Sequence, residues 1–145
     1  MKSNNKTIKD FEDFKVNVRI KLSSLWTSVT LCYLYGDYFE LYVPQKAEGL
    51  VNGDNLLDSP TKLFLASVML AIPAIMVFLS ISLKANVVRL LNMILASFFT
   101  LLMLFIAITS IEPWRAFYIF LAITESLFTG TIFWYAFKWP KKEVS

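Results

Sequence analysis

One acidic side chain lies in the middle of an apolar stretch of the sequence. Residues 116–137 contain no charged residue other than Glu125. A helix rises about 1.5 Å per residue, so in a membrane-spanning helix Glu125 would lie close to the bilayer midplane. A carboxylate at that depth costs several kcal/mol, and we therefore expect Glu125 to be protonated for much of the time or to face a wet cavity. Two interpretations follow: a binding site for a proton or a cation, or a hydrogen-bonding group that holds helices together.

A second set of polar side chains lies in the first apolar stretch, residues 22–43. Polar and aromatic side chains recur there at intervals of three and four residues, which places them on one face of a helix. They are Ser23, Trp26, Thr30, Tyr33, Asp37 and Glu40. Lipid does not accept such a face, so we expect it to contact protein or water.

The polar face of the first stretch and Glu125 are expected to meet. With both helices aligned at their midpoints, Tyr33 lies level with Glu125, and Asp37 and Glu40 lie progressively nearer the outer surface. Thr100, in the third apolar stretch, also falls near the midplane. This arrangement is an acidic vestibule that ends at a cluster of carboxyl and hydroxyl groups, which suits a path for a cation or a proton. The candidate residues for binding an ion, a proton or another ligand are Glu125, Tyr33, Asp37, Glu40, Thr30 and Thr100.

The alternative for the two outer acidic residues is purely electrostatic. In that interpretation Asp37 and Glu40 reach the outer headgroup zone of the membrane and form ion pairs with Arg115 or Lys62. Both interpretations remain open from the sequence.

Histidine and cysteine usage narrows the chemistry. The sequence has no histidine and one cysteine, Cys32, which removes the commonest metal ligand, the commonest general base and any disulfide within the chain. We therefore predict no metal site, no cofactor and no catalytic residue. An intramembrane enzyme ranks third among the function classes, because acidic residues and tyrosines are present without a pair of nucleophile and base.

The composition is typical of a membrane protein. Apolar residues make up 57% of the 145 residues and charged residues 17%, against roughly 45–50% and about 25% in soluble domains. The mean hydropathy is +0.57. The net charge is +3, but the basic residues gather at the ends of the apolar runs rather than in a stripe, so we predict no nucleic-acid binding.

Four stretches are predicted to cross the membrane, as an all-α, antiparallel four-helix bundle. They are residues 22–43, 63–83, 90–111 and 116–137. The first is the weakest, because Asp37 and Glu40 shorten its uncharged part; we reject a signal peptide there because no small-residue cleavage site follows. Ser59 followed by Pro60 predicts the N-terminus of the second helix, and Pro73 is expected to bend it.

The distribution of lysine and arginine predicts the orientation. Eleven of the 14 lie in the two tails and in the loop between the second and third helices, and three lie on the other side. By the positive-inside rule both termini are therefore cytoplasmic, and the expected location is the inner (cytoplasmic) cell membrane. Residues 1–21 form a basic N-terminal segment, either an amphipathic helix at the membrane surface or a loosely ordered tail, and residues 138–145 form a basic C-terminal tail.

A resemblance to known proteins is carried by the segments YLYGDYFELYVP, GLVNG, AIPAIMVFLSISLK and RLLN. With them the chain resembles a small uncharacterised family of bacterial four-span membrane proteins, a domain of unknown function, over nearly all of the sequence after residue 15. The resemblance implies the topology and no activity. In size and span number the chain is also similar to DoxX-like membrane proteins, without motif residues that would transfer a role. Small multidrug-resistance exporters have a similar length, but they carry the membrane glutamate in the first helix and not in the fourth.

Two function classes follow from these observations. The first is a transport or conductance protein linked to protons or cations, which uses Glu125 with Tyr33 and Asp37. The second is a non-catalytic membrane component that binds a lipid, a quinone or a partner protein, with the polar residues as contacts between helices. In both cases the lipid bilayer is the first partner, and a homodimer is expected because four thin helices enclose little space for a pore.

Overall fold

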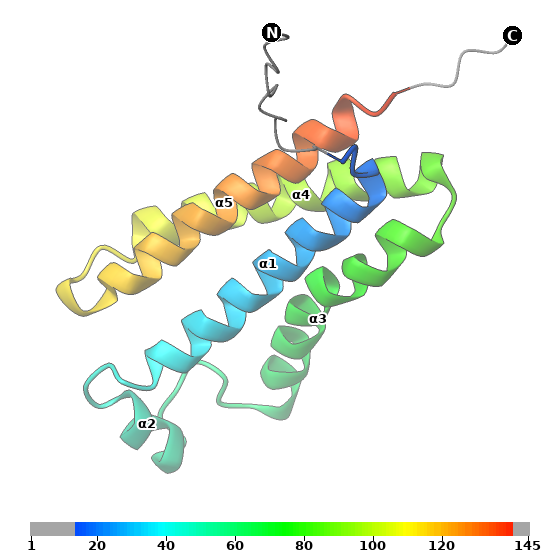
Figure 1. Ribbon diagram of the computed structural model, residues 1–145. Coiled ribbons are helices and arrows are strands. Elements are labelled where there is room, and N and C mark those ends of the chain that lie inside the picture. Colours follow the sequence, from blue (N-terminus) through cyan, green and yellow to red (C-terminus); the bar gives the residue numbers. More distant parts are fainter. Residues whose placement is uncertain (1–13, 141–145) are drawn as a thin grey trace, which may run out of the picture.

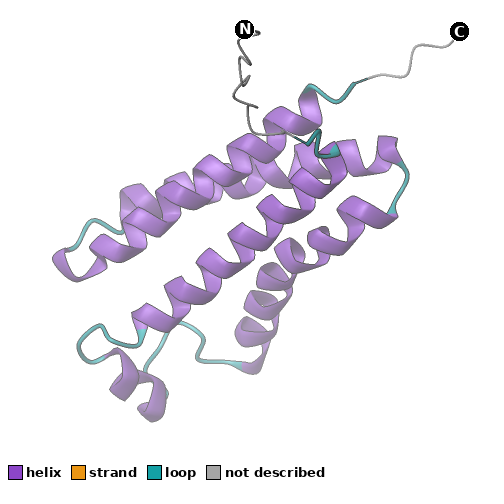
Figure 2. Ribbon diagram, viewed as in Figure 1, coloured by secondary structure: helices purple, strands orange, loops and turns teal. Residues whose placement is uncertain are grey.

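The computed structural model describes residues 14–140, and every regular element in that range is helical (Figures 1 and 2). Five α-helices and one short 3-10 turn follow one another along the chain. They are α1 (Val18–Glu40), α2 (Lys46–Asn52), α3 (Pro60–Ser82), α4 (Ala85–Thr109), η1 (Pro113–Arg115) and α5 (Ala116–Phe137). The prediction of an all-α fold is confirmed, and the short helix α2 is an addition to the predicted elements.

The four long helices form an antiparallel arrangement in which α1 is central (Figure 1). α1 packs against α3 on one side and α5 on the other, and α4 packs mainly against α5. The consecutive helices α3 and α4 contact each other little, although a short turn joins them. The order of the helices in space is therefore α3, α1, α5, α4, so the first helix of the chain has a long helix on each side.

The two ends of the bundle are formed by different elements (Figure 1). The start of α1, the α3–α4 turn and the end of α5 lie at one end, which we call the basic end. Its described charged residues are Lys15, Arg19, Lys21, Lys84, Arg89 and Lys138. The end of α1, helix α2 and the α4–α5 turn lie at the other end, which we call the acidic end. Its acidic residues are Asp37, Glu40, Glu48, Asp54, Asp58 and Glu112.

The start of α3 follows the predicted capping pattern. Ser59 Oγ accepts a hydrogen bond from the Lys62 backbone N–H at 3.3 Å, and Pro60 occupies the first helical position, where its missing N–H has no cost. Pro73 lies inside the same helix, and the ribbon of α3 bends along its length (Figure 1).

Three helices of the described range are long and apolar enough to cross a membrane, one fewer than the four predicted spans. They are Pro60–Ser82, Ala85–Thr109 and Pro113–Phe137. α1 has a comparable length of 23 residues but does not meet this standard, because charged residues lie at both of its ends and polar residues follow one face. It also begins before the predicted residue 22, because Asn17 Oδ1 caps it by accepting a hydrogen bond from the Arg19 backbone N–H at 2.9 Å.

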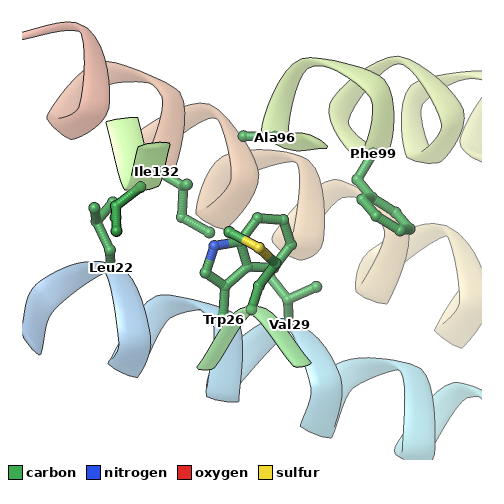
Figure 3. Packing of buried hydrophobic residues seen from close by; sticks show 8 residues of the cluster. Leu22, Trp26, Val29, Ala96, Phe99 and Ile132 are labelled. Carbon is green, nitrogen blue, oxygen red and sulfur yellow. The ribbon is translucent and has the colours of Figure 1, made fainter. Parts of the chain in front are cut away.

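The packed core lies in the half of the bundle nearer the basic end, where Trp26 is fully buried (Figure 3). Its indole Nε1 donates a hydrogen bond to Asn92 Oδ1 at 2.7 Å, and its ring meets Phe99 edge-on with centroids 6.0 Å apart. Asn92 Nδ2 in turn donates to the Val88 carbonyl at 2.8 Å. These contacts join α1 to α4 and fill the interior on the basic side of the predicted site.

Candidate functional site

A small cavity lies between α1, α4 and α5, toward the acidic end. Its volume is about 20 Å³, enough for roughly one water molecule. The polar side chains on its wall are Tyr33, Asp37, Tyr118 and Glu125. Gly36, Met103, Leu121 and Ala122 complete the lining. Of the residues predicted from the sequence, Tyr33, Asp37 and Glu125 therefore line one cavity.

Glu125 is buried in the wall of this cavity, with only 3% of its surface exposed. Among residues 14–140 no side chain donates a hydrogen bond to its carboxyl group: the Tyr33 hydroxyl has no partner, and Thr100 is directed to Thr129. The interpretation of Glu125 as a hydrogen-bonding group between helices therefore finds no partner in the described part of the chain.

The Tyr33 hydroxyl is the second unusual polar group of the site. It is buried and forms no hydrogen bond with any residue between 14 and 140. Its ring packs against Phe99 with centroids 6.1 Å apart, which ties the cavity wall to the core. Leaving a buried hydroxyl unsatisfied costs about 1–3 kcal/mol, and native proteins keep such groups mainly where a ligand or water contacts them. This hydroxyl is therefore available to a ligand in the cavity.

A wide pocket of about 720 Å³ lies outside the cavity, between the end of α1, helix α2 and the segment that leads to α3. Asp37 and Tyr118 line both spaces. The pocket wall also carries Glu40, Asp54 and Lys46, so its charged lining is mostly acidic. We call the two spaces together the vestibule. It consists of the open acidic pocket and the small cavity, which adjoin at Asp37 and Tyr118.

The acidic residues around the vestibule differ in their partners. Glu40 Oε1 lies 3.0 Å from Lys46 Nζ and 3.6 Å from Arg115 Nη2, so Arg115 is a partner that the electrostatic alternative named, whereas Lys62 pairs with Asp58 instead. Asp37 and Glu125 form no ion pair with any residue in the described range. They are thus the carboxyl groups of the cavity that no basic side chain within that range neutralises.

The two predicted threonines do not line the cavity. Thr30 Oγ1 donates to the Trp26 carbonyl at 2.9 Å within α1. Thr100 Oγ1 lies 2.7 Å from the Ala96 carbonyl and 2.7 Å from Thr129 Oγ1. Both hydroxyls are used in contacts within or between helices, so neither Thr30, predicted from the polar face of the first helix, nor Thr100, predicted from its depth near the midplane, lines the cavity. Spacing along one helix and depth in the membrane do not specify the direction of a side chain.

Five residues of the cavity wall are missing from the predicted set, and the sequence carries a signal for two of them, Tyr118 and Gly36. Tyr118 precedes Glu125 by two helical turns, so their spacing places both on one face of α5, a signal present in the sequence. Gly36 faces Tyr118 across the helix interface: a β-carbon at position 36 would lie 3.7 Å from Tyr118 Cε2. A glycine on the polar face of α1 is a signal for close approach of another helix. Met103 has no such signal, because it is one apolar residue among many.

The donor set limits the ligands that the cavity can bind. Within residues 14–140 there is no group of three or more histidine, cysteine or acidic side chains that could hold a metal ion. The oxygens of two carboxyl and two phenol groups are hard donors, which bind a proton or a hard cation.

Comparison with known families places the sequence without assigning it an activity. A model described as a family of unknown function (DUF6326) matches residues 8–145. Searches of curated proteins and of solved structures found no match. The match agrees with the resemblance to an uncharacterised family that the sequence segments indicate. The chain therefore belongs to the DUF6326 family of unknown function.

Proposed function

We propose that this protein crosses the membrane four times and binds a proton or a small cation in the cavity lined by Asp37 and Glu125, as part of a transport or conductance function. One observation carries the proposal. Two carboxyl groups that have no basic partner in residues 14–140 lie on the wall of one small cavity, and an open acidic pocket adjoins it.

Three features support α1 as the fourth membrane span. Its 23 residues rise roughly 34 Å, about the thickness of the hydrocarbon core with some tilt. Its charged residues lie near its two ends, where headgroups and water accept them: Arg19, Lys21, Asp37 and Glu40. It also lies between α3 and α5 (Figure 1), and Ser23 and Trp26 of its polar face are buried. A span of lower hydropathy is tolerated where neighbouring helices shield it from lipid.

The charge distribution supports an orientation with the basic end in the cytoplasm. The acidic pocket would then open to the exterior. A reporter inserted after Lys84, in the α3–α4 turn, should report the cytoplasm, and a reporter inserted after Asn52, at the end of α2, should report the exterior. The reverse result, or both reporters on one side, would contradict this topology.

The order of the groups suggests a route for the ion. The acidic pocket concentrates cations by electrostatic attraction. Asp37 and Tyr118, at the boundary of pocket and cavity, contact the ion first, and Glu125 receives it at the inner wall. Release at the basic end requires the packing around Trp26 to open. Transport would therefore involve a second conformation in which the cavity is accessible from the basic end.

The second candidate function is the non-catalytic membrane component, and the packed core favours it. Trp26, Asn92 and Phe99 close the interior between the cavity and the basic end. A protein that keeps this packing would bind a proton, a cation or another ligand from one side only, without moving it across the membrane.

Ion flux in proteoliposomes separates the two functions. Under an imposed gradient of protons, Na⁺ or K⁺, the wild-type protein should carry ions, and Glu125→Gln should abolish the flux. Glutamine is neutral and nearly isosteric, so the variant should keep the fold. Glu48→Gln, which removes an exposed carboxylate of α2 at the same end, is the matched control and should not change the flux. If folded, oriented wild-type protein carried no ions, transport would be contradicted. The non-catalytic membrane component would then be the remaining candidate function. Flux retained in Glu125→Gln would contradict the assigned role of Glu125.

A further inference from the structure

A second large pocket lies at the basic end, remote from the cavity. Its volume is about 770 Å³, and its wall is formed by the segment before α1, the first turns of α1 and α4, and the chain just after α5. Three basic side chains from separate parts of the chain converge on it: Lys15, Arg19 and Arg89. No acidic side chain of the described residues lines it. Such a pocket favours an anion.

The two guanidinium groups are held in place from the protein side. Arg19 Nη1 donates to the Ile81 carbonyl at 3.0 Å and also to the Leu83 carbonyl, and its guanidinium lies 5.9 Å from the centre of the Trp139 ring. Arg89 Nε donates to the Ala136 carbonyl at 3.1 Å.

These bonds have a structural role, because they satisfy carbonyls near the ends of α3 and α5. They leave further guanidinium N–H groups unused, since each guanidinium has five. The remaining donors are thus fixed in position near the pocket, which lowers the entropic cost of binding a phosphate group. The start of α4, with Asn86 on the pocket wall, adds the favourable end of a helix dipole.

A narrower groove extends this pocket along the side of α4. It has a volume of about 340 Å³ and shares Asn86 and Arg89 with the basic pocket. Its other wall residues, Leu90 and Met93, are apolar, and Leu90 is 58% exposed. A free phosphate ion would use the basic pocket only. A phospholipid uses both spaces, with its headgroup among the basic side chains and its acyl chain against α4.

We propose that the basic end carries a binding site for an anionic phospholipid, with the headgroup phosphate held by Lys15, Arg19 and Arg89 and an acyl chain lying along Leu90 and Met93. Basic pockets between membrane helices are a known form of headgroup recognition. The site lies at the opposite end of the bundle from Glu125, so the inference is independent of the proposed ion site.

The test uses the full-length protein in a neutral detergent, with lipid binding titrated by native mass spectrometry. Dioleoylphosphatidylglycerol should bind more tightly than dioleoylphosphatidylcholine, which has the same acyl chains and a zwitterionic headgroup. Lys15→Gln and Arg89→Gln should each weaken phosphatidylglycerol binding roughly fivefold, the effect of one charge near an anionic headgroup. Lys62→Gln makes the same charge change at the acidic end and should have no effect. Lys15 is exposed and lies outside the helices, so its variant decides the outcome if Arg89→Gln does not fold.

A substitution in the apolar groove distinguishes the binding of a phospholipid from the binding of a free phosphate ion. Leu90→Ser should weaken phosphatidylglycerol binding and leave the binding of inorganic phosphate unchanged. Equal binding of the two lipids, or phosphatidylglycerol binding that Lys15→Gln does not weaken, would overturn the site. Inorganic phosphate that binds as tightly as phosphatidylglycerol, with no effect of Leu90→Ser, would overturn the assignment to a lipid.

Discussion

The basic and acidic ends of the bundle use their charged residues in opposite ways. At the acidic end the basic side chains, which are Lys46, Lys62 and Arg115, all lie in ion pairs with nearby carboxylates. At the basic end Arg19 and Arg89 donate to backbone carbonyls, and no described acidic side chain neutralises them. At the acidic end the basic side chains are therefore neutralised by neighbouring carboxylates. The carboxyl groups of the vestibule that lie outside these ion pairs have no basic partner among the described residues. The basic end keeps its positive charge available for membrane headgroups.

The same contrast continues inside the bundle. One face of α1 supplies Trp26 to the packed core and, two turns later, Tyr33 to the cavity. The indole N–H of Trp26 has a hydrogen-bond partner, whereas the hydroxyl of Tyr33 has none within residues 14–140. A single polar face thus contributes to the packed core in one half of the molecule and to the cavity wall in the other.

The largest expected effect on stability comes from a substitution in the packed core. Trp26→Ala removes a fully buried side chain and leaves Asn92 without its donor, and we expect the free energy of unfolding to fall by about 3–5 kcal/mol. Tyr33→Phe removes a buried hydroxyl that bonds to no described residue, and it should therefore raise the free energy of unfolding by about 1–3 kcal/mol. Thermal unfolding in detergent, followed by circular dichroism, measures both. Equal losses in the two variants would mean that the halves do not differ in packing.

A smaller effect is expected from the ion pairs of the acidic end. Glu40→Gln removes the shared carboxylate of Lys46 and Arg115, whose side chains are 37% and 27% exposed, and should cost about 1 kcal/mol. Asp58→Asn breaks the more exposed pair with Lys62, at 2.7 Å, and should cost roughly 0.3–0.5 kcal/mol. Both losses should shrink in high salt, because exposed pairs are screened. A larger loss for Asp58→Asn would show that Glu40 is not the centre of this network.

A similarly small effect on stability is expected at the cavity wall. Gly36→Ala places a methyl group in ordinary contact with Tyr118, 3.7 Å from its ring, and should stabilise the protein by roughly 0.5 kcal/mol through helix propensity. The methyl group narrows the cavity, so ion uptake in proteoliposomes should decrease. Gly130→Ala is the matched control, because a β-carbon there meets nothing within 4 Å and residue 130 does not line the cavity. If Gly130→Ala decreased ion uptake by the same amount, the decrease in Gly36→Ala could not be attributed to the narrower cavity.

By itself the sequence determined the features that depend on one segment at a time. Predicted residues 116–137 coincide with α5, and Ser59 with Pro60 starts α3, because apolar length and capping chemistry are local properties. The separation of charge between the ends follows from the same local runs. Glu125 was identifiable for the same reason, as a single acid inside an apolar stretch.

Only the tertiary structure decided which side chains share a space. Tyr118 faces the cavity and Thr100, at similar depth to Glu125, does not. Glu40 lies near Asp37 in sequence but is paired with Lys46 and Arg115. The central position of α1 could not be predicted from the sequence either, because the hydropathy of a helix does not determine which other helices pack against it. The rotation of each helix about its axis is set by the packing of all four long helices together, and spacing within one helix cannot specify it.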